Sequence, residues 1–162
     1  MGRYTIPMKL ALSFFLLFML LGLASSIALY HQQFGFDSEL AGDYYRGNVD
    51  DPDAKVMLVE KSYRQLLEVT HFHLYIMPIV YLALVHLYFL SAQPQWEKIL
   101  MTVGTFLGLL LEISAPWIVR YASGGWSRLF WGSGLLITIP TVWMCLICFL
   151  ELWWRPGAGE TS

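Results

Sequence analysis

The stretch THFHLYIMPIVYLALVHLYFLS, from Thr70 to Ser91, decides the class of this protein. It is apolar along most of its length and is as long as a helix that crosses the hydrocarbon core of a bilayer, for which about 20 residues suffice. Because lipid offers the backbone no hydrogen-bond partners, such a segment is expected to be an α-helix. It also carries three of the four histidines of the chain, and polar groups at this depth point to function.

The composition extends this interpretation to the whole chain. Of the 162 residues, 57% are hydrophobic and only 14% are charged, and the mean hydropathy is +0.54. This balance is far more apolar than that of soluble domains. The formal net charge of −2, without a basic patch in the sequence, argues against a general nucleic-acid binder. The two cysteines, Cys145 and Cys148, lie in one apolar run, so the sequence indicates no disulfide framework.

Three more apolar runs of similar length accompany the first one. We predict an all-α integral membrane four-helix bundle, a single membrane domain over residues 1–162, with transmembrane helices at 8–30, 70–91, 99–119 and 129–152. The tryptophans gather mostly near the ends of these runs, as interfacial anchors do. Gly104 and Gly108 form a GxxxG pair in the third run, which permits close approach by a neighbouring helix.

The long connection, residues 31–69, is expected to carry a short amphipathic helix on the membrane surface. Asp53 is a plausible N-cap for this helix, which would continue into the second transmembrane helix. The apolar residues that follow Asp53 recur at helical spacing: Val56, Val59, Tyr63, Leu66 and Leu67.

The distribution of basic residues predicts a bacterial inner-membrane protein with both termini in the cytoplasm. Arg3 and Lys9 precede or begin the first apolar run, Lys98 lies in the 92–98 connection, and Arg155 follows the fourth run. Against this orientation, several basic residues fall on the outer side: Arg46, Lys55, Lys61, Arg64, Arg120 and Arg128. The first run can alternatively be a cleaved signal peptide, but it is longer than the roughly 7–15 apolar residues of a signal core, which favours a retained helix.

The histidines are the main candidates for a cofactor site. In an antiparallel arrangement, His31 at the end of the first helix and His71 and His73 at the start of the second share one depth. A b-type haem needs two axial ligands on facing helices. We expect His31 and His73 to be the favoured pair, with His71 as the substitute and His86, nearer the other face, as a second ligand.

Three other uses of these histidines remain open. His31, His71 or His73, with Glu68, can bind copper or zinc, since imidazole suits both metals and a carboxylate completes the shell. For quinone or quinol binding, an imidazole near the interface hydrogen-bonds a quinone carbonyl while a nearby acid handles the proton, and Glu112 in the third helix is the candidate for that acid or for pairing with a histidine. The plain structural alternative is that the imidazoles are interfacial side chains that reach toward the headgroups.

The sequence therefore predicts a small electron-transfer subunit that binds b-type haem, quinol or both and passes electrons to a membrane or periplasmic partner. The alternatives are a noncatalytic accessory or assembly subunit, which would bind partner helices through its glycine-containing third helix, and a copper-handling membrane protein. The chain has no nucleophile elbow, phosphate loop or zinc-protease pair, so nothing supports a hydrolase or transferase. Any enzymatic part would be that of a redox subunit.

Overall fold

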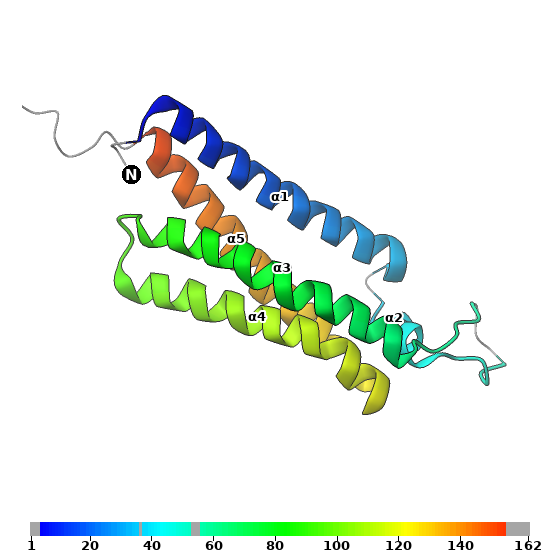
Figure 1. The fold of residues 1–162 in the computed structure, drawn as a ribbon. Coiled ribbons are helices and arrows are strands. Elements are labelled where there is room, and N and C mark those ends of the chain that lie inside the picture. Colours follow the sequence, from blue (N-terminus) through cyan, green and yellow to red (C-terminus); the bar gives the residue numbers. More distant parts are fainter. Residues whose placement is uncertain (1–3, 36, 53–55, 155–162) are drawn as a thin grey trace, which may run out of the picture.

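The computed structural model describes residues 4–35, 37–52 and 56–154, and within them it is all-helical. Four long helices form an elongated bundle (Figure 1). The elements in chain order are α1 (Ile6–Phe34), α2 (Ser38–Arg46), α3 (Tyr63–Phe89), α4 (Gln95–Tyr121), the 3-10 helix η1 (Gly124–Arg128) and α5 (Leu129–Trp153). We call the end of the bundle that carries α2 the α2 end, and the opposite end, where α3 turns into α4, the turn end.

The prediction of four membrane-spanning helices is confirmed. The helices α1, α3, α4 and the segment Gly124–Trp153, which joins η1 and α5, are each long and apolar enough to cross a bilayer. Each of these segments extends beyond the predicted apolar run at one or both ends, because polar residues can continue a helix into the headgroup region. Many large apolar side chains face outward, as expected for a surface in contact with lipid.

The four long helices do not contribute equally to the bundle. The most extensive packing joins α4 to α5, and α3 packs on both of them. Helix α1 lies along one flank of the bundle (Figure 1), where it packs mainly on α5 and touches α2 at its end. Only Leu16 and Phe34 of α1 are buried. The compact part of the bundle is therefore built from α3, α4 and α5.

The two glycines of the GxxxG pair, Gly104 and Gly108, both lie on the face of α4 that packs on α5. A methyl group added at Gly108 would lie 2.9 Å from Cγ1 of Ile137 and 3.1 Å from the backbone carbonyl carbon of Leu136, whereas one at Gly104 would meet Cγ of Pro140 at 3.7 Å. The expected close approach by a neighbouring helix thus occurs at Gly108, and the neighbour is α5. At this position the pair serves the bundle itself and not a partner protein.

The connection between α1 and α3 contains a short amphipathic helix, as predicted, but its position was wrong. The helix is α2, Ser38–Arg46, whose Ala41 and Gly42 are buried while Glu39 and Arg46 are exposed. Asp37 caps it by accepting a hydrogen bond from the Glu39 amide at 2.8 Å. Asp53, the expected N-cap, lies outside the described residues.

The residues expected to form a helix after Asp53 instead divide between a non-helical segment and the start of α3. Residues 56–62 are not helical, and the side chain of Asn48 holds this segment by donating to the Val56 carbonyl at 2.9 Å and accepting from the Leu58 amide at 2.7 Å. Helix α3 then begins after Ser62, where Ser62 and Gln65 form a capping box. The cap separates the apolar residues before it from Tyr63, Leu66 and Leu67, which lie in the first turns of α3.

A turn at Gly47 fixes the path of this connection and gives a first testable prediction. Gly47 has a φ of +80°, and an added Cβ would lie 2.8 Å from the backbone nitrogen of Glu60. We expect Gly47→Ala to make the connection more sensitive to limited proteolysis, because both the left-handed backbone and the close contact oppose the side chain. Gly35→Ala is the control, since Gly35 has a φ of +57° but no atom within 4 Å of an added Cβ. Equal protease sensitivity of the two variants would contradict the role of the contact.

Candidate functional site

Glu112 is the centre of a polar cluster inside the bundle. It lies on α4 and is half-buried, and its Oε2 accepts a hydrogen bond from the Ser133 hydroxyl of α5. Ser133 is itself fully buried, and its hydroxyl also lies 3.2 Å from the Phe130 carbonyl. A carboxyl group at this depth is unfavourable unless it is partnered, and Ser133 provides that partner.

Among the predicted histidines, His73 lies within electrostatic range of Glu112. It is half-buried on α3, which packs against α4. Its Nδ1 lies 2.8 Å from the carbonyl oxygen of Val69. Because a carbonyl oxygen only accepts, Nδ1 carries the proton in this hydrogen bond, and neutral His73 then presents Nε2 as an acceptor.

Three tyrosines complete the surroundings of Glu112. Tyr30 from α1, Tyr45 from α2 and Tyr81 from α3 all interact electrostatically with the carboxyl group. Tyr45, outside the membrane-spanning helices, stacks on Phe130 with a ring distance of 5.3 Å. Burial is the main cause that raises the pKa of Tyr45 above its ordinary value, and Tyr44, Glu112 and Tyr30 add to the shift. Tyr45 is therefore a neutral phenol at physiological pH.

The other predicted histidines lie at the expected ends of their helices, but their side chains are exposed. His31 at the end of α1 and His71 near the start of α3 are both exposed and belong to the α2 end, while His86 is exposed nearer the turn end. The ring of His71 packs on Tyr75 at 4.8 Å. His73 and Glu112 lie on two helices that pack together, α3 and α4, and within electrostatic range of each other.

The haem and copper hypotheses gain no supporting contact. Helix α3 packs mainly on α4 and α5, whereas α1 packs mainly on α5 and also touches α2, so His31 and His73 lie on helices that are not principal packing partners. In the part of the chain that the structure describes, no three His, Cys, Asp or Glu side chains are grouped closely enough to hold a metal ion. The axial pair His31 and His73, and a copper site at His31, His71 and His73, stay predictions.

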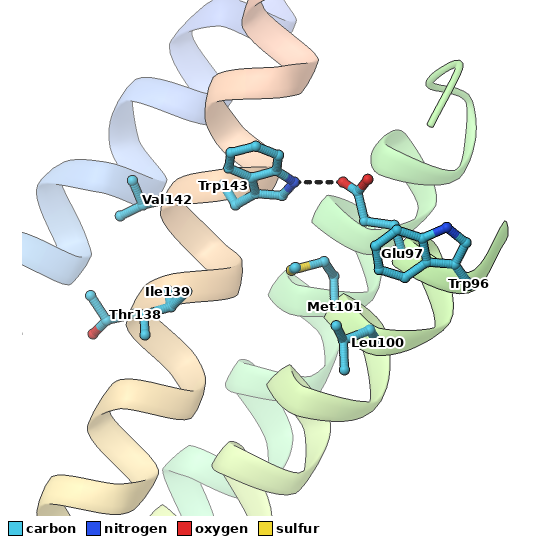
Figure 2. A pocket seen from close by; sticks show the side chains of 8 residues that line it. All are labelled: Trp96, Glu97, Leu100, Met101, Thr138, Ile139, Val142 and Trp143. Carbon is cyan, nitrogen blue, oxygen red and sulfur yellow. Dashed lines mark hydrogen bonds between the residues drawn. The ribbon is translucent and has the colours of Figure 1, made fainter. Parts of the chain in front are cut away.

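Sequence reasoning missed a second buried carboxyl group, Glu97, in the first turn of α4. Its Oε1 accepts hydrogen bonds from the Tyr88 hydroxyl at 2.5 Å and from Nε1 of Trp143 at 2.6 Å, the latter shown in Figure 2. Glu97 lay in the segment interpreted as a connection, 92–98. The available signal was Trp143, which stands in the middle of an apolar run and not near its end, and so needed a partner for its N–H within the bundle.

Comparison with known proteins gives a family but no function. No similar protein was found among curated sequences, and no similar structure among solved ones. The family model Aq_1264_TM, described as a transmembrane helical domain, matches residues 35–158, which include α2, α3, α4 and α5 and leave out all of α1. The match covers most of the chain and agrees with the helices of the compact bundle. The chain belongs to the Aq_1264_TM family of transmembrane helical domains.

Proposed function

We propose that this protein is a quinol-binding subunit of a membrane electron-transfer system, with the quinol ring held between His73 and Glu112. The observation that supports the proposal is that an imidazole and a carboxyl group, on two helices that pack together, lie within electrostatic range of each other. Each is half-buried and thus reachable by a ligand. Quinols are apolar molecules with hydroxyl groups, and an imidazole with a nearby acid is suited to accept their protons.

Each of the two side chains would accept one proton of the quinol. A quinol hydroxyl would donate to Nε2 of His73, because Nδ1 is engaged by the Val69 carbonyl. Glu112, held at Oε2 by Ser133, has Oε1 to accept the second proton. Oxidation of the quinol to the quinone releases two protons and two electrons, and the electrons would pass to a haem- or metal-containing partner protein. Tyr45, as a neutral phenol beside Glu112, would help to keep bulk water from the site.

Quinone content of the purified protein tests this proposal. We expect the wild-type protein, solubilised in mild detergent from its native membrane, to retain quinone that organic extraction and chromatography can quantify. His73→Ala and Glu112→Gln should each lower the amount per protein by about tenfold, the loss expected when one hydrogen bond involving a charged or proton-accepting group is removed. His86→Ala is the matched control on the same helix, because His86 is exposed and lies thirteen positions after His73, about 20 Å further along the axis of α3.

Two results would contradict the quinol proposal. Unchanged quinone content in both His73→Ala and Glu112→Gln would show that these side chains do not bind the ring. Alternatively, the dithionite-reduced protein can show the Soret and α bands of a b-type haem, lost in both His31→Ala and His73→Ala. That outcome would assign His73 to haem ligation and replace the quinol site with the axial pair.

A further inference from the structure

The buried apolar core of the bundle is interrupted at the level of Glu112. One cluster of buried residues lies toward the turn end, and a second cluster lies at the α2 end. Glu112 on α4 and its partner Ser133 on α5 each stand between a residue of the first cluster and a residue of the second. These flanking residues are Leu109 and Ala115 on α4, and Ile137 and Phe130 on α5. The bundle thus has a polar layer between two apolar ones.

Helix α1 packs on the bundle on either side of this polar layer but is uncovered between these contacts. Leu16 belongs to the cluster toward the turn end, and Phe34 belongs to the cluster at the α2 end. Residues 24–29, which we call the uncovered segment of α1, are all exposed. Because each helical residue is turned by about 100° from the one before, six successive residues point in every direction around the axis. The side of α1 that faces the bundle is therefore uncovered over a length of about 9 Å.

The uncovered segment lies beside Ser133. Helix α1 runs antiparallel to α5 (Figure 1), and the ring of Tyr30 lies 6.5 Å from the ring of Trp131. The residues that precede Tyr30 therefore pass the residues that follow Trp131, and Ser133 is among these. Glu112, which accepts the Ser133 hydrogen bond, is within electrostatic range of Tyr30. The uncovered segment and the polar layer are thus at the same level of the bundle.

The inner face of α3 also loses its cover at this level. Tyr81 and Tyr88 on this face are buried, whereas Met77 and His73, one and two turns before Tyr81, are only half-buried. His73 is within electrostatic range of Glu112. An uncovered face of α1 and a half-covered face of α3 therefore both adjoin the Glu112 carboxyl group.

The length and chemistry of the uncovered segment indicate which molecule fits it. Ser25 and Ser26 donate their hydroxyl groups to the Gly22 carbonyl at 2.8 and 3.0 Å, and the other residues are alanine, isoleucine and leucine, so the surface is apolar. A helix is about 10–12 Å across, so a partner helix has too little room to cross here, whereas a single hydrocarbon chain is narrow enough. A ring with hydroxyl groups at the end of that chain can donate to Nε2 of His73 and Oε1 of Glu112, which the acyl chain of a phospholipid cannot do.

We infer that an isoprenoid quinol enters the His73–Glu112 site from the bilayer between α1 and α3, and that its tail then lies against the uncovered segment of α1. The inference rests on the proposed function and adds to it the route of entry and the surface that binds the tail. It also assigns a role to α1, which packs on the bundle above and below the polar layer and leaves the layer itself accessible from lipid.

Ser26 and Ser25 provide a matched pair of variants. Ser26 lies three residues after Leu23 and four before Tyr30, so it is on the same side of α1 as these half-buried residues, whereas Ser25 is on the opposite side. Both serines are exposed, and both donate to the Gly22 carbonyl. Ser26→Trp therefore places an indole where the tail is expected, while Ser25→Trp places it in lipid.

Equilibrium binding of quinols to the full-length protein in nanodiscs tests the inference. The probes are ubiquinol and menaquinol headgroups, each with and without a decyl tail. We expect Ser26→Trp to raise the Kd of the tailed quinol about tenfold and to leave the Kd of the tailless one unchanged, because the indole displaces only the tail. Ser25→Trp should change neither value.

The possible failures of this test can be told apart. Equal affinity of the Ser26→Trp and Ser25→Trp proteins for the tailed quinol would overturn the inference and leave the uncovered segment to bilayer lipid; weaker binding in His73→Ala would show that the ring site itself remains. Equal weakening of tailed and tailless binding by Ser26→Trp would also overturn it, because the ring and not the tail would then contact α1. Wild-type binding that His73→Ala does not weaken would contradict the proposed function, and the route of entry with it.

Discussion

Leucine in place of Glu97 is expected to lower the free energy of unfolding of the solubilised protein by about 2–4 kcal/mol. The substitution removes the acceptor of two hydrogen bonds, from the Tyr88 hydroxyl and the Trp143 N–H. Tyr88 is 0% exposed, so its hydroxyl would stay buried without that partner. The loss also includes the favourable interaction of a carboxylate with the first turn of α4, where the helix dipole stabilises negative charge. Unfolding in mixtures of mild detergent and dodecyl sulfate, followed by far-ultraviolet circular dichroism, measures the difference.

Glu97→Gln separates the loss of the acceptor from the loss of charge. The amide oxygen can still accept from Tyr88 and Trp143, so the expected decrease is about 1 kcal/mol, the difference between hydrogen bonds to charged and neutral acceptors. A leucine variant as stable as the glutamine variant would contradict this account. It would mean that Tyr88 and Trp143 find other partners when the carboxylate is gone.

The membrane fold could be predicted because lipid restricts the choice of structure. An apolar run such as Thr70–Ser91 has one stable conformation in hydrocarbon, a helix whose backbone groups bind one another. The prediction for residues 129–152 agrees with α5 to within one residue at its end. The 31–69 connection contains many polar residues and is not confined to hydrocarbon, so its conformation is not restricted in this way.

In that connection the sequence contained two competing signals. Val56 and Val59 have the spacing of a helical face, but Ser62 and Gln65 have the spacing of a capping box, and the cap determines where α3 begins. The helix α2 required different signals, an Asp37 cap and a Gly47 stop. These residues lie before Asp53, ahead of the segment that was predicted to be helical. Local capping therefore outweighed apolar periodicity at this boundary.

The candidate site was predictable only in part, because the sequence does not determine which helices pack together. His73 and Glu112 stood out as polar groups inside apolar runs. That they lie within electrostatic range of each other depends on α3 packing against α4, and the surroundings of His31 depend on α1 packing mainly on α5. A four-helix sequence with short turns permits several such arrangements. Ser133 gave no signal, since a lone serine in a membrane helix is equally suited to helix packing.

The His73–Glu112 site lies within the part of the chain that the family model matches. His73 lies on α3, Glu112 on α4 and Ser133 on α5, all within residues 35–158. Helix α1 lies entirely outside that match and contributes Tyr30 to the surroundings of Glu112. The site thus depends on the α4–α5 contact, which joins Glu112 to Ser133.

That contact can be tested at its closest point, Gly108, for which we expect Gly108→Ala to lower the free energy of unfolding by about 1–3 kcal/mol. The added methyl group would lie 2.9 Å from Ile137 and 3.1 Å from the backbone of Leu136. The Ile137 side chain can shift by a few tenths of an ångström, but the Leu136 backbone can move only with α5 itself. The same detergent-mixture titration measures the effect, and loss of quinone from this variant would follow from separation of Glu112 and Ser133.

Gly104→Ala is the matched control, because it makes the same chemical change one turn away on α4. An added methyl group at Gly104 meets Pro140 at an ordinary contact distance of 3.7 Å. Both substitutions gain helix propensity, worth up to about 1 kcal/mol in favour of alanine. We therefore expect Gly104→Ala to be neutral or slightly stabilising, so that the difference between the two variants isolates the steric term. If both variants were equally stable, α4 and α5 would have room for a side chain at Gly108, and the close helix contact that joins Glu112 to Ser133 would be wrong.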